Sequence, residues 1–146
     1  MKALARILLA LAVVALLPLS SHAQQNYSNV SVYRVVKFRI LPGKTNDFYS
    51  YLNSIQKVFE AEKAAGLILG YDLMHSVNYE GPDKYDVMFV LHYKDMATFD
   101  TLADKAAPVI AKAYGTPENR AAVAKLGEES AETVSSELVR EIKLKP

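Results

Sequence analysis

The chain has 146 residues, with 17 basic and 16 acidic side chains and no cysteine. This length suits one domain with its own core, and the lack of cysteine excludes disulfides, thiolate catalysis and thiolate metal sites. The near-neutral charge and the lack of a basic cluster argue against a nucleic-acid partner.

The first residues are typical of a secretory signal peptide. Lys2 and Arg6 precede an unbroken apolar run over residues 7–17, and Ala23 is a small residue at the expected cleavage point. The run is shorter than the roughly 20 apolar residues that span a bilayer. We therefore predict a signal peptide over 1–23, a single domain over 24–146, a secreted or periplasmic location, and no membrane association after cleavage. An uncleaved N-terminal anchor is the alternative.

The first predicted strand covers residues 30–41 and has two different faces. One face carries Val32, Arg34, Val36, Phe38 and Ile40, and the other carries Tyr33, Val35, Lys37 and Arg39. Such alternation is typical of a strand with one face against a helix layer. Pro42-Gly43 should end the strand, and apolar residues at three- and four-residue steps predict a helix over 45–65.

Two further strands are predicted over residues 67–75 and 85–93, and the short polar connection between them favours an antiparallel pair. A helical region opens at Asp95, and Pro108 should kink or restart it. Thr116 is the expected N-cap of a short third helix that closes near Gly127. An acidic connection over 128–133 and a last strand over 133–144 complete the domain.

The order strand, helix, strand, strand, broken helix, strand predicts an α+β fold. It is the split strand–helix–strand arrangement of a ferredoxin-like βαββαβ sandwich, with a four-stranded antiparallel sheet and helices on one face.

Two stretches of the chain carry a resemblance to a known superfamily. Residues 37–44 read as a strand ending in Pro-Gly, with Phe48 just after, and the strand over 85–93 leads into an Asp-Met-Ala-Thr-Phe helix start at 95–99. This resembles the dimeric α+β barrel superfamily, and within it the antibiotic-biosynthesis-monooxygenase-like and stress-responsive groups. The resemblance implies a homodimer whose two sheets pack face to face and whose interior can hold a ligand.

The residues agree with a homodimer. The helix-free face of the sheet would expose an apolar patch of Val35, Met88, Val90 and Val139, which a second copy would cover. The superfamily also contains haem-degrading and cofactor-free oxygenases, whose site patterns include a Trp that this chain lacks.

His75 and His92 are the only histidines after the predicted cleavage point and are candidate catalytic proton carriers. The alternative is a solvated histidine at a strand end. No spacing typical of a metal site is present, so no metal and no cofactor are predicted.

Five residues are candidate ligand contacts. Lys37 and Arg39 could hold an anion, or they could pair across strands with Glu137 and Glu141. Tyr33, Tyr71 and Tyr93 could line a pocket for a flat aromatic ligand, or they could simply pack on strands. Two other arginines stand among apolar neighbours, where each could bind a carboxylate or sit at a strand end: Arg34 and Arg140.

Three functions remain open. The first is a secreted homodimeric barrel protein that binds a small hydrophobic or aromatic molecule. The second is a cofactor-independent monooxygenase-like enzyme on a substrate of that kind. The third is a non-catalytic structural or stress-related protein, which predicts a filled interior without a cavity.

Overall fold

The computed structural model describes residues 27–78 and 80–145, so the predicted signal peptide at 1–23 lies outside the described residues. Within this range the helices and strands follow in the order β1 (Tyr27–Ile40), α2 (Thr45–Ala64), β2 (Gly70–His75), β3 (Val87–Tyr93), the short 3-10 helix η1 (Met96–Thr98), α3 (Phe99–Tyr114), α4 (Pro117–Ser130) and β4 (Ala131–Leu144).

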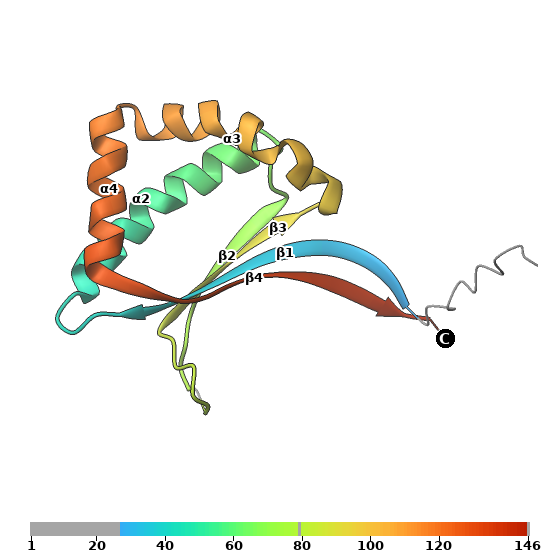
Figure 1. Ribbon diagram of the computed structural model, residues 1–146, viewed down its shortest axis with the longest axis horizontal. Helices are drawn as coiled ribbons and strands as arrows, with labels where there is room; N and C mark the ends of the chain where they lie inside the picture. Colours follow the sequence, from blue (N-terminus) through green and yellow to red (C-terminus); the bar gives the residue numbers. More distant parts are fainter. Residues whose placement is uncertain (1–26, 79, 146) are drawn as a thin grey trace, which may run out of the picture.

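The strands form one four-stranded sheet in the order β2-β3-β1-β4, and every neighbouring pair is antiparallel. The three α-helices lie on one side of the sheet (Figure 1). This is the ferredoxin-like α+β arrangement, and the predicted fold class is confirmed. The two central strands are β3 and β1, so their helix-facing side chains form the floor of the core.

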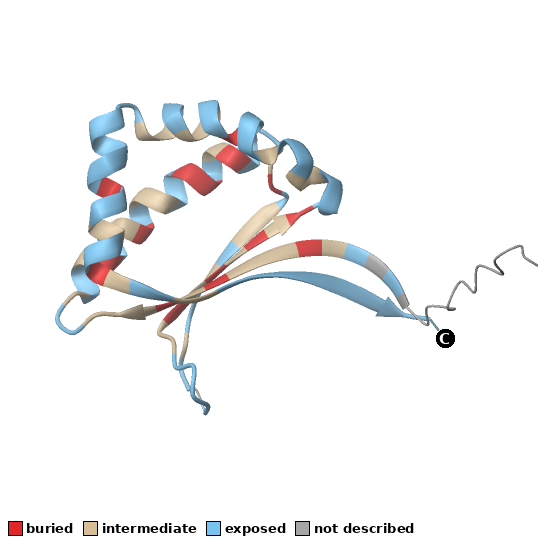
Figure 2. Ribbon diagram, viewed as in Figure 1, coloured by how far each residue is buried: buried red, intermediate tan, exposed pale blue. Residues whose placement is uncertain are grey.

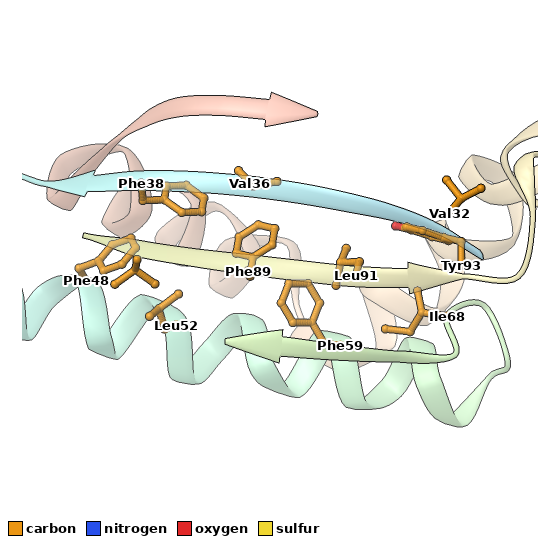
Figure 3. Close-up of a cluster of buried hydrophobic side chains, with 11 residues drawn as sticks. Val32, Val36, Phe38, Phe48, Leu52, Phe59, Ile68, Phe89, Leu91 and Tyr93 are labelled. Atoms are coloured by element: carbon orange, nitrogen blue, oxygen red, sulfur yellow. The ribbon is translucent and has the colours of Figure 1, made fainter. Parts of the chain in front are cut away.

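The core forms where the apolar faces of β1 and β3 meet the apolar stripe of α2. Phe48 is 0% exposed, and burial of a side chain of this size contributes roughly 2–3 kcal/mol. Figure 3 shows the α2 side chains Phe48 and Phe59 pointing at the sheet. The buried cluster comprises Val32, Val36, Phe38, Phe48, Leu52, Phe59, Ile68, Val87, Phe89, Leu91 and Tyr93.

The predicted ending of the last helix is wrong. Thr116 does cap α4, since its hydroxyl accepts a hydrogen bond from the Asn119 N–H at 3.2 Å. The helix, however, passes through Gly127 to Ser130, and β4 begins at Ala131 with no acidic loop between. The physical reason is packing: a Cβ on Gly127 would lie 2.7 Å from Cε2 of Tyr51, so glycine allows α4 to approach α2 closely.

One of the two predicted effects of Pro108, a restart of the helix, is absent. The helix does not restart there, because α3 is continuous from Phe99 to Tyr114 with Pro108 inside it. A proline removes one backbone hydrogen bond of the helix, and α3 nevertheless continues through it while packed against α2.

The strands β1 and β4, each of 14 residues, extend past the helix layer as a two-stranded ribbon (Figure 1). Figure 2 shows that β4 is exposed along most of its length. Within residues 27–78 and 80–145, none of the helices is both long and apolar enough to cross a membrane.

Candidate functional site

A cavity with a volume of about 1120 Å³ lies between the sheet and helices α2, α3 and α4. It slightly exceeds the usual range of about 300–1,000 Å³ for clefts that hold small molecules. Its walls are mainly apolar and include Phe38, Phe59, Phe89, Phe99, Leu102 and Ile110. A hydrophobic molecule of drug size could therefore lie inside the protomer.

Polar side chains from six different elements line the same cavity. They include Arg34 on β1, Glu62 on α2, Tyr93 on β3, Tyr114 on α3, Arg120 on α4 and Glu132 on β4. In the described part of the chain, neither Arg34 nor Glu62 forms a hydrogen bond or an ion pair. Glu62 is nevertheless only 9% exposed. Charged groups in such places ordinarily have partners, so this pair is the most unusual chemical feature of the cavity.

Burial and mutual electrostatics shift the acids of this cavity. Burial raises the pKa of the Glu62 carboxyl, and the charge of Arg34 opposes that rise. Burial also raises the pKa of Tyr93, with Arg34 lowering it and Glu62 raising it. The pKa of Tyr114 is raised by burial, against the charge of Arg120. Glu62 therefore keeps its proton to a higher pH than an exposed glutamate does.

The local sequence explains how these charged residues reach an apolar cavity. Arg34 falls between Val32 and Val36 on the core face of β1, and Glu62 follows Phe59 by three residues on the stripe of α2. The guanidinium carbon of Arg34 also lies 5.9 Å from the centre of the Phe99 ring, which favours a cation there. A charged residue at an apolar position of a periodic pattern is the signal that indicates such a site.

His92, by contrast, lies on the other face of the sheet. Its Nε2 is 2.8 Å from Oδ2 of Asp72, and its ring meets the edge of Tyr33 at 4.9 Å. The Tyr33 hydroxyl donates to Oε2 of Glu141 at 2.9 Å, and this bond raises the pKa of Tyr33. These residues form a polar cluster away from the cavity.

The structure does not bring the two predicted catalytic histidines together. His75 is exposed at the end of β2 and pairs with Val87, whereas His92 pairs with Gly70 at the other end of the ladder. Five residues of β3 separate the two levels, which is roughly 17 Å at about 3.4 Å per residue. Their side chains also belong to opposite faces, so one protomer cannot use both at one reacting atom.

The lysine and arginine predicted as anion contacts are engaged elsewhere. Lys37 Nζ lies 3.5 Å from Oε1 of Glu137, which agrees with the alternative of cross-strand pairing. Arg39 donates to Glu132 and to the carbonyl oxygen of Lys84, not to Glu141. A register shift between β1 and β4 after Lys37 places Glu132 opposite Arg39.

Of the seven predicted site residues, Tyr93 alone lines the cavity. Tyr71 packs its ring on Phe59 at 5.3 Å, and its hydroxyl donates to Glu60 at 2.5 Å and accepts from Gln56 at 3.1 Å. Glu62, Tyr114 and Arg120 were not predicted as site residues from the sequence. Across residues 27–78 and 80–145, no group of three or more His, Asp or Glu side chains could hold a metal ion.

No protein-family model and no curated protein matches the chain. Several solved structures are similar to it. A dimeric ferredoxin-like protein from Thermobifida fusca is 15% identical over 82% of this chain and 97% of that one, with a TM-score of 0.48. A dimeric protein with a ferredoxin-like fold from Bacteroides fragilis is 16% identical over 76% and 94%, with a TM-score of 0.44.

A third similar structure, from Chloroflexus aurantiacus, is provisionally assigned as an antibiotic biosynthesis monooxygenase. It is 12% identical over 80% of this chain and 95% of that one, with a TM-score of 0.40. These neighbours are of the kind that the resemblance in the sequence named. Likenesses at this level carry nothing about binding or catalysis, and the ferredoxin-like fold rests on the strand order and pairing of the chain itself.

Proposed function

We propose that the protein binds a small, partly aromatic or hydrophobic molecule in the cavity between its sheet and its helices. The observation that carries this proposal is an apolar cavity with two charged groups, Arg34 and Glu62, that have no hydrogen-bonding partner in the described part of the chain. A ligand with matching polar groups would satisfy both and bury its apolar body. The cavity also speaks against the structural-protein hypothesis, which predicted a filled interior.

A pair of matched variants tests the binding proposal. Ala106 lines the cavity and Ala107 is an exposed neighbour that does not. Ala106→Phe should fill part of the cavity and weaken binding of the neutral fluorescent probe N-phenyl-1-naphthylamine, whereas Ala107→Phe should leave it unchanged. Saturable binding that both variants retain equally would contradict binding in this cavity, and so would the absence of any saturable binding to the parent protein.

A catalytic role for the same cavity is the second proposal, and one observation favours it. Glu62 is a buried carboxyl with a raised pKa beside two tyrosines, Tyr93 and Tyr114, and perturbed acids of this kind are typical of proton-transfer sites. A cofactor-independent reaction on a bound aromatic molecule would use Glu62 as the proton carrier. His75 and His92 stay proposed carriers for chemistry outside the cavity.

Metabolite profiling distinguishes catalysis by Glu62 inside the cavity from catalysis by His92 outside it. Purified protein is incubated with a small-molecule extract of its host, and mass spectrometry follows the products. We expect a product that Glu62→Gln abolishes and His92→Ala preserves. The reverse result would place the chemistry at the His92 cluster, and unchanged extracts would leave binding without catalysis.

We also propose that the protein is a homodimer and that it is exported. The helix-free face carries the half-buried apolar residues Val35, Met88 and Val90 beside the exposed Val139, and a second copy would remove this patch from water. Export follows from the N-terminal signal pattern. Intact-mass measurement of protein from its own host should give a chain beginning at Gln24; a chain that retains Met1 would contradict cleavage.

A further inference from the structure

We propose that the ligand is a flat carboxylic acid with an apolar body, that its carboxylate binds Arg34, and that Glu62 takes up a proton when it binds. This inference rests on the proposed ligand-binding function and names the chemical class that the cavity selects. Three features of the described residues support it: the free guanidinium, the neighbouring carboxyl and the aromatic walls.

Arg34 is the first feature. Its guanidinium is half-buried at the cavity wall, where it forms no hydrogen bond or ion pair with any described residue. A guanidinium offers five N–H donors in a planar fork that matches a carboxylate with two parallel bonds. The other arginine of the cavity, Arg120, is exposed and close enough to Tyr114 to lower its pKa. Arg34 is therefore the anchor for the polar end of the ligand.

Glu62 is the second feature, and it distinguishes an anion from a cation. It shares the cavity with Arg34 and interacts with it electrostatically without a direct bond. Arg34 cannot release its proton, whereas a buried glutamate can gain one. The pair can thus adapt to an entering anion by protonating Glu62, whereas the fixed positive charge of Arg34 would repel an entering cation.

The proton balance follows from the groups around Glu62. The other titratable or charged groups lining the cavity are Arg34, Tyr51, Tyr93, Tyr114, Arg120, Glu128 and Glu132. Glu128 is exposed and Glu132 pairs with Arg39, so Glu62 is the buried carboxyl of the cavity. An anion on Arg34 would lie beside an ionised Glu62 in a poorly hydrated space, which costs free energy. One proton taken from the buffer neutralises Glu62, and its carboxyl can then donate a hydrogen bond to the ligand.

The aromatic walls are the third feature, and they define the shape of the ligand. The ring centre of Phe89 lies 5.1 Å from that of Phe38 and 5.3 Å from that of Phe59, and Phe99 sits beside Tyr93 at 4.6 Å. Figure 3 shows Phe59 of α2 directed toward Phe89 of β3. Flat rings pack well against such surfaces in stacked or edge-on arrangements.

Isothermal titration calorimetry with two isosteric probes, 2-naphthoate and the neutral 2-naphthamide, tests the inference. At about pH 8 the probe acid is ionised, so a proton taken up on binding goes to the protein. We expect 2-naphthoate to bind at least about tenfold more tightly than 2-naphthamide, as one charge-assisted pair allows. Titrations in phosphate and in Tris should differ in heat, because a proton is taken from the buffer when the ligand binds.

Variants assign the two roles. Arg34→Gln should remove the preference for the acid, and Arg34→Lys should restore part of it. Glu62→Gln should still bind 2-naphthoate but lose the dependence of the heat on the buffer. Arg140→Gln, the same change at an exposed arginine outside the cavity, should match the parent protein. Circular dichroism melts establish that each variant is folded.

The possible results distinguish failure of the acid preference from failure of the proposed ligand-binding function. Equal affinity for the two naphthalene probes, with N-phenyl-1-naphthylamine still bound, overturns the acid preference and leaves the binding function intact. Acid preference without proton uptake overturns the role of Glu62. Failure of all three probes to bind overturns the binding function itself.

Discussion

At the scale of single residues, two charged side chains stand at positions where the strand and helix periodicity predicts apolar ones. Arg34 and Glu62 occupy core-facing positions of β1 and α2, and both line the cavity instead of being packed away from it. A group held in this way affects stability through its protonation state, because burial disfavours the ionised form. Glu62 is the residue at which this effect can be measured.

The stability of the protein should fall as pH rises through the titration of Glu62. The folded state raises the pKa of this carboxyl above its ordinary value of 4.5. Below that value both states are protonated and there is no penalty. Above it the unfolded state ionises first, so the penalty grows until the pH exceeds the raised pKa of the folded state. Glu62→Gln should therefore gain stability relative to the parent across this window.

Urea denaturation at intervals between about pH 4 and pH 8 measures this difference. Glu80→Gln provides the control, because Glu80 is exposed in a loop. The control should track the parent at every pH. A Glu62→Gln curve that is also parallel to the parent would show that the carboxyl is not held in a low-dielectric place.

At the scale of elements, α4 shows how one contact overrides a local signal. Gly127 is typical of a helix end, and yet the helix continues past it to Ser130; the glycine serves packing instead, because the ring of Tyr51 occupies the space where a side chain would be. Tyr51 in turn packs on Phe48 at 5.8 Å in the core. The approach of α4 to α2 closes one side of the cavity, so a packing detail between two helices shapes the site.

Gly127→Ala should destabilise the protein by about 1–3 kcal/mol, the usual cost of overpacking. In a Tyr51→Ala background the same change should become stabilising by up to about 1 kcal/mol, since alanine is the better helix former. Thermal or urea unfolding of the four proteins in this double-mutant cycle gives the coupling energy. Equal effects of Gly127→Ala in both backgrounds would mean that Tyr51 does not set the helix spacing.

At the scale of the whole molecule, one face of the sheet has helices and the other has none (Figure 1). The bare face is apolar in its middle, and polar contacts such as Lys37–Glu137 and Asp72–His92 border it. An apolar centre with a polar rim is typical of an interface between subunits. The exposed ribbon of β1 and β4 adds Val139 to this face, because Val139 pairs with Tyr33.

Val90→Lys should convert the proposed dimer into a monomer. Val90 lies on the bare face between Val35 and Asp72, so a lysine there is tolerated by the fold through the acidic neighbour but is unfavourable against an apolar partner. Val77→Lys is the matched control, because Val77 is 97% exposed in a loop. Sedimentation velocity should find the parent and Val77→Lys dimeric. A dimeric Val90→Lys, or a monomeric parent, would contradict this interface.

The sequence by itself determined the kind and order of the elements, because strand alternation, helical stripes and the caps at Pro42-Gly43 and Thr116 are local signals. It also predicted the two faces of β1 and the bare apolar patch, since residue parity along a strand assigns each side chain to a face. Only the tertiary structure decided which polar residues meet. Arg34, Glu62 and Tyr114 come from separate elements, and their proximity depends on helix packing and on the close approach at Gly127. His75 and His92, on the two strands of the predicted antiparallel pair, are held apart by the register of β2 on β3, which is set by pairing across strands and not by any local pattern.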